Sequence, residues 1–107
     1  MKKRVMHMGR LKPDKLEEYK EFHRNVWPEL QQVYREAGIT QISCCLHGTQ
    51  LLIFTEYDDA IYPAAKAALA QNEVELRWAA LMRPLADPDW KSVEFEEVFY
   101  MPPSDAP

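Results

Sequence analysis

Long apolar runs are missing from this sequence of 107 residues. A helix that spans a bilayer needs roughly 20 consecutive apolar residues, and no stretch approaches that length. The basic residues at 2–4 are followed by His7, Gly9 and Arg10 rather than by the apolar segment of a secretory signal peptide. We therefore expect no membrane partner and a cytoplasmic location.

An excess of positive charge is missing as well. Lysine and arginine together number 13 against 17 aspartate and glutamate residues, which gives a net charge of −4. Binding to nucleic-acid phosphates needs a concentrated basic face, so we expect no nucleic-acid partner. The proportions of hydrophobic residues, 47%, and charged residues, 28%, are typical of a globular protein. The length predicts a single domain over residues 1–101 with a flexible tail at 102–107.

Cysteine is scarce, and the two cysteines, Cys44 and Cys45, are adjacent. Neighbouring residues of a strand point to opposite faces, so these thiols cannot form a disulfide without distorting the backbone. They also lack the spacing and the companion ligands of a zinc site, and the acidic residues are scattered. We expect two reduced, small packing residues and no metal site.

Hydrophobic periodicity divides the chain into six elements, because apolar residues recur every second residue in strands and every three to four residues in helices. Pro28 is expected to bend the first helix near Arg24 or Asn25, and Gly38 to end it. In chain order the elements are a strand at 4–11, a helix at 13–37, strands at 39–47 and 51–57, a helical region at 62–85 with a break at 71–72, and a strand at 93–101.

This order, βαββαβ, predicts an α+β, ferredoxin-like fold: a four-stranded antiparallel sheet with helices on one face. The other face of such a sheet needs a cover. Because several strands carry apolar residues on both faces, we expect a homodimer that packs sheet against sheet.

Tyr19 and His23 are the candidate functional pair. They lie four residues apart in the first helix, so their side chains share one face with Val26, Trp27 and Leu30. A phenol beside an imidazole suits proton transfer, since a histidine side chain ordinarily titrates near pH 6.5. The alternative interpretation, a tyrosine and a histidine that serve only the core, remains open at this point.

Several stretches together resemble the L-rhamnose mutarotase family over nearly the whole chain. The strongest is EEYKEFHRNVWPEL at residues 17–30, with glutamate and tyrosine, a histidine four residues on, and then Trp-Pro-Glu-Leu. Gly38 follows at the family distance, Arg77-Trp78 with Met82 corresponds to a second family element, and EVFYMP at 97–102 resembles the closing strand.

The resemblance implies an isomerase that interconverts the α and β anomers of a monosaccharide, with a ferredoxin-like fold and a dimeric assembly. It implies that His23 is the catalytic proton donor and that Tyr19 and Trp78 contact the substrate. Trp27 offers a second flat apolar face for a sugar or for the core. Ring opening is facile, so acid and base groups suffice and we expect no cofactor.

Two positions depart from the family pattern. A substrate-contacting tyrosine of the family falls at Ile42, and the second tryptophan of a pair falls at Ala79. Loss of a polar contact changes substrate preference strongly, so L-rhamnose and another 6-deoxy sugar such as L-fucose both remain candidates. A small-molecule-binding dimer without turnover and a cofactor-free monooxygenase of similar fold are the alternatives of other classes.

Overall fold

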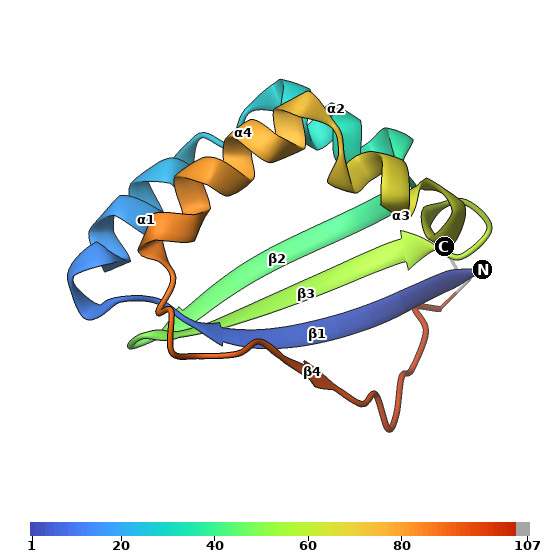
Figure 1. The fold of residues 1–107 in the computed structure, drawn as a ribbon. Helices are drawn as coiled ribbons and strands as arrows, with labels where there is room; N and C mark the ends of the chain where they lie inside the picture. The colour runs from blue at the N-terminus through green and yellow to red at the C-terminus, as the bar shows by residue number, and fades with distance from the viewer. Residues whose placement is uncertain (105–107) are drawn as a thin grey trace.

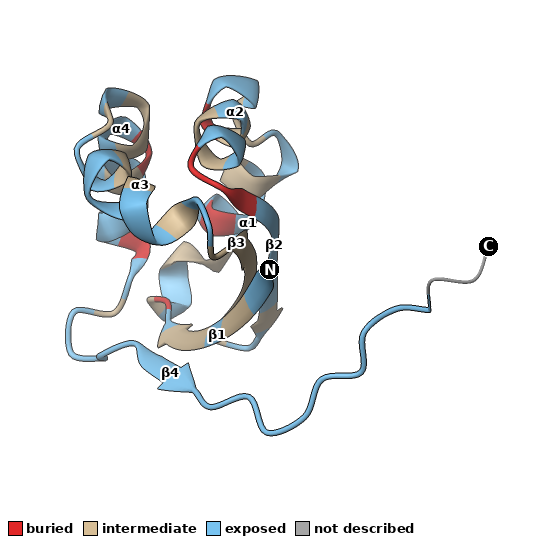
Figure 2. Cartoon of the chain, turned by 90° about the vertical axis from the view of Figure 1, so that its right-hand side faces the viewer, coloured by how far each residue is buried: buried red, intermediate tan, exposed pale blue. Residues whose placement is uncertain are grey.

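The computed structural model describes residues 1–104, which form one antiparallel sheet with helices packed on one of its faces (Figures 1 and 2). The sheet order is β2-β3-β1-β4. This is the α+β, ferredoxin-like arrangement that the sequence predicts. In chain order the elements are β1 (Lys2–Arg10), the 3-10 turn η1 (Pro13–Lys15), α1 (Leu16–Arg24), α2 (Pro28–Glu36), β2 (Ile39–His47), β3 (Gln50–Asp58), α3 (Tyr62–Ala70), α4 (Glu73–Met82), the 3-10 turn η2 (Arg83–Leu85) and β4 (Val93–Phe95).

The first helical region is two helices, so the prediction of a single bent helix is wrong. Helix α1 ends at Arg24, and α2 begins at Pro28, which occupies its first turn. Trp27, just before the proline, has an extended backbone with φ −54° and ψ 127°. Proline lacks an N–H and disfavours a helical conformation in the residue before it, so the chain leaves the helix and restarts.

The second helical region breaks where the sequence predicts, at residues 71–72. Helix α3 ends at Ala70 and α4 begins at Glu73. The Asn72 side chain accepts hydrogen bonds from the backbone N–H groups of Val74 and Glu75, at 2.8 and 3.3 Å. An asparagine in this position satisfies donors that the first helical turn leaves free.

The last strand is much shorter than the predicted span of 93–101. Strand β4 comprises Val93–Phe95 and pairs only with Met6–Met8 of β1 among the described residues. From residue 96 the chain is no longer paired in the sheet, and its far end extends past the body of the molecule (Figure 2). Its alternating pattern is that of a strand, but a strand also requires a partner. Of the predicted tail at 102–107, residues 102–104 have no regular structure and 105–107 lie outside the described residues.

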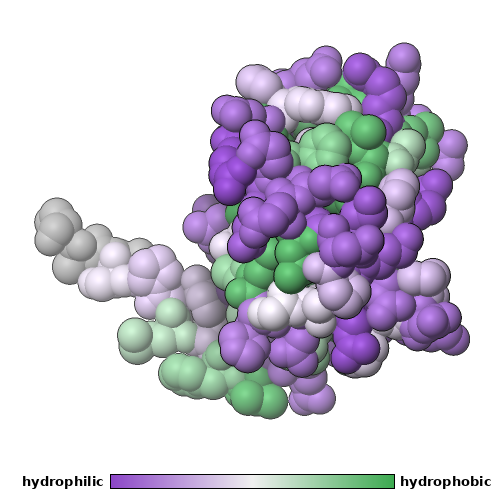
Figure 3. Space-filling view, turned by 90° about the vertical axis from the view of Figure 1, so that its left-hand side faces the viewer, coloured by the Kyte–Doolittle hydropathy of each residue, from purple (hydrophilic) through white to green (hydrophobic). Residues whose placement is uncertain are grey.

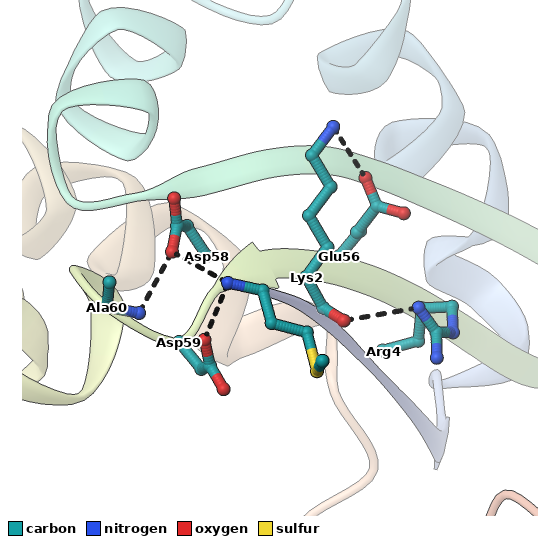
Figure 4. A network of polar contacts seen from close by, with 7 residues as sticks. Lys2, Arg4, Glu56, Asp58, Asp59 and Ala60 are labelled. Carbon is teal, nitrogen blue, oxygen red and sulfur yellow. Dashed lines mark hydrogen bonds and ion pairs between the residues drawn. The ribbon is translucent and has the colours of Figure 1, made fainter. Parts of the chain in front are cut away.

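A polar network ties the start of β1 to the end of β3 (Figure 4). The Met1 ammonium nitrogen lies 3.0 Å from Asp59 Oδ1 and 3.8 Å from Asp58 Oδ1, and Asp58 also accepts a hydrogen bond from the Ala60 N–H. Lys2 Nζ lies 3.8 Å from Glu56 Oε1. These contacts lie at the end of the sheet where Lys2 faces Asp58 across the two strands.

The register assigns every strand residue to a sheet face. Val5 of β1, Ile53 of β3 and Leu46 of β2 face the helices, whereas Met6 and Phe54 face away. Strand β2 changes its phase at a bulge between Ile39 and Gln41. The core lies between the helices and the sheet, with buried Leu11, Tyr19, Leu51 and Leu85 at its centre and Leu16, Phe22, Leu46, Ile53 and Met82 packed against them.

Gly38 joins α2 to β2 in a conformation that only glycine adopts readily, with φ +91°. A Cβ atom at this position would lie 2.8 Å from Ile61 Cβ. We expect Gly38→Ala to lower the free energy of unfolding by at least about 2 kcal/mol, since backbone strain and a steric clash add.

Two other glycines serve as controls, with urea denaturation as the measurement. Gly48 has φ +60° and open space around it, so Gly48→Ala should cost only about 1–2 kcal/mol from the left-handed backbone. Gly9 has neither constraint, and Gly9→Ala should change stability by less than about 0.5 kcal/mol. Equal losses at Gly38 and Gly9 would contradict the account.

Candidate functional site

An open pocket of about 360 Å³ lies between α1 and β2. We call it the α1–β2 pocket, and its lining comprises Tyr19, Lys20, His23, Arg24, Cys44 and Leu46. The helix contributes two pairs, Tyr19 with His23 and Lys20 with Arg24, and the members of each pair are four residues apart and so share one side of the helix. The strand contributes alternate residues, which share one face of a sheet. Its volume is at the lower end of the roughly 300–1,000 Å³ range of small-molecule sites.

Tyr19 and His23 lie together in this pocket, as their spacing predicts. Their rings stack with centroids 4.0 Å apart and an angle of 23° between the planes. Tyr19 is only 6% exposed and belongs to the central core cluster. His23 is half-buried and lines the pocket. The buried tyrosine ring is therefore a rigid platform for the imidazole.

A hydrogen bond fixes the protonation pattern of the His23 ring. Its Nδ1 lies 2.7 Å from the backbone oxygen of Tyr19. A carbonyl oxygen can only accept, so Nδ1 carries the proton and donates. The second ring nitrogen, Nε2, accepts a proton in the neutral ring and donates one in the imidazolium. This arrangement provides one general acid/base in the pocket.

The Tyr19 hydroxyl group keeps its proton. Burial is the main cause that raises the pKa of Tyr19 far above its ordinary value, and the neighbouring Cys44 side chain raises it further. A phenol whose charged form is disfavoured by burial acts as a neutral hydrogen-bond donor or acceptor. Tyr19 is thus suited to hold a hydroxyl group rather than to ionise.

Lys20 and Arg24 form a cationic rim on the exposed side of α1. Lys20 Nζ lies 3.3 Å from Glu17 Oε1, and Arg24 pairs with Glu21. Both pairs are three residues apart on the helix surface and solvated, so they contribute little to stability. Their donors border the pocket, where hydroxyl groups of a bound molecule can reach them.

Trp78 lies behind His23 rather than in the pocket lining. The two ring centroids are 5.4 Å apart and the planes are at 75°, an edge-to-face contact. Trp78 is 8% exposed and makes further edge-to-face contacts with Phe22 and Trp27. Among the sequence candidates, the structure therefore brings together Tyr19, His23 and Trp78, and places Trp78 as the packing support of the imidazole.

The other three candidates lie away from the pocket lining. Trp27 is half-buried, with its ring centroid 5.2 Å from that of Trp78 and the Arg77 guanidinium 5.6 Å away. Ile42 is exposed on β2, and Ala79 is half-buried on α4. The departures from the family pattern at Ile42 and Ala79 thus fall outside the residues that line the α1–β2 pocket.

The sequence interpretation missed Lys20, Arg24, Cys44 and Leu46. The prediction that both cysteines serve as packing residues is wrong, since both are exposed and Cys44 lines the pocket. The helix residues carried a signal, because each directly follows a candidate, Tyr19 or His23. Cys44 carried none, since its approach to α1 is a tertiary contact.

Metal and membrane features give no further site in the described part of the chain. Residues 1–104 hold no group of three or more histidine, cysteine, aspartate or glutamate side chains placed to bind a metal ion. No helix within this range is both long and apolar enough to cross a bilayer.

The fold and the pocket together define a small α+β, ferredoxin-like protein with a histidine of its first helix in an open pocket. Comparison with known proteins narrows this class. The family model for L-rhamnose mutarotase matches residues 4–101. The L-rhamnose mutarotase of Klebsiella pneumoniae strain 342 is 35% identical over 94 residues, which are 83% of this chain and 88% of the relative. The chain therefore belongs to the L-rhamnose mutarotase family, and it is an isomerase.

Solved structures agree with this assignment. The crystal structure of the L-rhamnose mutarotase from Formosa agariphila superposes with a TM-score of 0.74 and 29% sequence identity, covering 94% of this chain and 99% of that one. A putative antibiotic biosynthesis monooxygenase from Nitrosomonas europaea has a TM-score of 0.63 at 19% identity, with 92% of this chain and 91% of that one covered. At that identity the likeness concerns the fold alone.

Trp78 is buried and packs against His23 without lining the pocket. Removing its side chain should therefore lower the stability of the protein more than it weakens ligand binding. We expect Trp78→Ala to lower the free energy of unfolding by about 3–5 kcal/mol, the cost of a large buried aromatic. Trp90 is exposed and contacts the Arg10 guanidinium at 4.6 Å, so Trp90→Ala should cost less than about 1 kcal/mol. Chemical denaturation measures both, and a neutral Trp78→Ala would refute the buried placement.

Proposed function

We propose that this protein interconverts the α and β anomers of a 6-deoxyhexose pyranose, with L-rhamnose as the first candidate, and that the reaction takes place in the α1–β2 pocket. The observation that carries the proposal is the His23 ring, whose Nδ1 is tied to the Tyr19 carbonyl and whose Nε2 is left for proton transfer. Membership of the family supplies the substrate class.

The proposed reaction needs a proton at the ring oxygen and the loss of one from the anomeric hydroxyl. Protonated Nε2 of His23 gives its proton to the ring oxygen while the bond from C1 to that oxygen breaks. The anomeric hydroxyl passes its proton to water at the open mouth of the pocket, and the free aldehyde forms. After rotation about the C1–C2 bond the same steps run backwards, and His23 recovers its proton.

The Tyr19 hydroxyl and the cationic rim orient the sugar in this proposal. Tyr19 remains protonated and exchanges hydrogen bonds with one sugar hydroxyl, since burial disfavours its phenolate. Lys20 and Arg24 donate to other hydroxyls from the outer side. The apolar Leu46 side chain offers a surface for the C–H groups and the 6-methyl group.

L-fucose is the alternative substrate within the same reaction class. It is favoured by the departures at Ile42 and Ala79, since these exchange a phenol and a large aromatic for smaller apolar groups. A non-catalytic binding dimer and a cofactor-free monooxygenase are alternatives of other classes. Saturation-transfer NMR between anomers separates them, because only a mutarotase accelerates anomer exchange.

The decisive variant is His23→Ala, assayed by saturation transfer with L-rhamnose and L-fucose. We expect the enzymatic exchange to fall by about 10²–10⁴-fold, the usual contribution of a general acid/base. Loss of one half-buried hydrogen bond should cost only about 0.5–1.5 kcal/mol of stability. His47→Ala is the matched control, since His47 is exposed beyond the pocket lining, and it should retain wild-type exchange. Full activity of His23→Ala would refute the assignment.

We also propose that the protein is a homodimer whose copies meet through the open face, the sheet face turned away from the helices. Figure 2 shows the helices on one side of the sheet, and no helix or further strand of the described residues covers the other. The open face carries Met6, Val93 and Phe95, all exposed. Exposed apolar surface of this kind is typical of a protein–protein interface.

The C-terminal arm, residues 96–104, supports the same proposal. Arg4 on the open face holds it at two points, through hydrogen bonds of 2.9 and 3.0 Å to Glu97 and through the Tyr100 ring, whose centroid lies 3.3 Å from the guanidinium carbon. Between these points Val98 and Phe99 are 88% and 79% exposed. Figure 3 shows apolar side chains gathered at the foot of the molecule, where the arm leaves it. A second copy would bury them.

Light scattering after size exclusion tests this assembly. We expect wild-type protein at micromolar concentration to have twice the 12.5 kDa mass of one chain, and Phe99→Ser to shift the equilibrium toward monomer. Leu76→Ser, which removes an exposed apolar side chain from α4 on the helical side, is the control and should stay dimeric. A monomeric wild type would refute the proposal.

A further inference from the structure

Cys44 and Cys45 are neighbours in the chain but lie on opposite faces of the sheet. Cys44 is paired with Ile53, which packs against the core under the helices, and Cys45 is paired with Leu52 on the next position. The bulge between Ile39 and Gln41 decides which cysteine faces α1, because one extra residue in a strand switches all later side chains to the other face.

The Cys44 side chain on β2 and the Tyr19 side chain on α1 border the same α1–β2 pocket. The two side chains interact, and both line the cavity that also contains His23. Cys44 is exposed at the pocket, but the surrounding protein atoms still shield its sulfur from water and raise the pKa of Cys44, so the group is a neutral thiol. It is a weak donor and acceptor, suited to holding a hydroxyl group and not to nucleophilic attack.

Strand β2 brings no other hydrogen-bonding side chain into this pocket among the described residues. Leu46, two positions after Cys44, is apolar and lines the pocket, whereas Ile42, two positions before, is apolar and lies outside the lining. Cys44 therefore supplies the polar side chain of β2 in this pocket, two residues beyond Ile42, where the family has a tyrosine. Two residues correspond to a shift of about 6.6 Å along the strand at the usual rise per residue.

We propose that Cys44 is a positioning residue for the sugar site: its thiol holds the Tyr19 hydroxyl in the orientation that meets the substrate, and the bound sugar covers the thiol. This inference rests on the proposed function, since it names the same pocket as the place where the sugar binds. The inference adds Cys44 to the proposed site and predicts that a bound sugar protects the Cys44 thiol from alkylating reagents.

Three variants test the positioning role in the anomer-exchange assay. Cys44→Ala leaves the buried Tyr19 hydroxyl without this partner, so we expect KM to rise about 3- to 10-fold with kcat nearly unchanged, the effect of one neutral hydrogen bond. Cys44→Ser keeps a hydrogen-bonding group and should restore most of the affinity. Cys45→Ala, on the opposite face, is the matched control and should keep wild-type KM.

Alkylation by iodoacetamide tests whether the sugar covers the thiol. The reaction is followed by mass spectrometry in two single-cysteine variants, Cys45→Ala, which retains Cys44, and Cys44→Ala, which retains Cys45. We expect millimolar L-rhamnose to slow the labelling of Cys44 at least several-fold and to leave the labelling of Cys45 unchanged. Equal rates for Cys44 with and without sugar would overturn the shielding part of the proposal.

A third measurement separates failure of this inference from failure of the proposed function. The NMR resonances of the Tyr19 ring should shift in Cys44→Ala and stay unchanged in Cys45→Ala, whether or not the protein turns over a sugar. A wild type without anomer exchange on either sugar would reject the proposed function and leave this contact supported by the shift. Unshifted Tyr19 resonances together with an unchanged KM in Cys44→Ala would overturn the positioning role.

Discussion

The burial of the Tyr19 ring between α1 and the sheet is the constraint on which the rest of the structure depends. The ring closes the core cluster with Leu11, Leu51 and Leu85, residues that come from three other parts of the chain. A buried aromatic of this size contributes strongly to stability, and its position fixes the distance and rotation of α1 relative to β3 and β2. The pocket between α1 and β2 is a consequence of this packing.

The same ring links the core to the chemistry. Its outer face supports the His23 imidazole, and its backbone oxygen accepts the proton of Nδ1, so both the orientation and the tautomer of the histidine follow from where Tyr19 lies. Trp78 makes an edge-to-face contact with the same imidazole. Contact with two buried aromatic rings keeps the imidazole in a defined position although the pocket itself is open, which suits the acid/base role that we propose for it.

Local signals in the sequence identified the elements well, and the errors arose where a distant partner decides the outcome. Strand Ile39–His47 and the helix break at 71–72 follow from alternation and from a capping asparagine, both of which act over a few residues. The pattern at 93–101 is equally strand-like, yet only Val93–Phe95 pair with β1, and the rest of the segment leaves that edge of the sheet. Pro28 ended a helix and began another, because its ring forces Trp27 out of the helical region.

The sequence by itself determined the pairing of Tyr19 with His23, since a helix places residues four apart on one face whatever surrounds it. It also determined that Cys44 and Cys45 face opposite ways. Only the tertiary structure decided which of the two cysteines lies next to Tyr19. A single-residue bulge near Thr40 sets which side chains of β2 face the helices, and the packing of α1 on that strand places Tyr19 beside one of them. Strand phase depends on pairing with β3 along its whole length, which no local pattern of residues encodes.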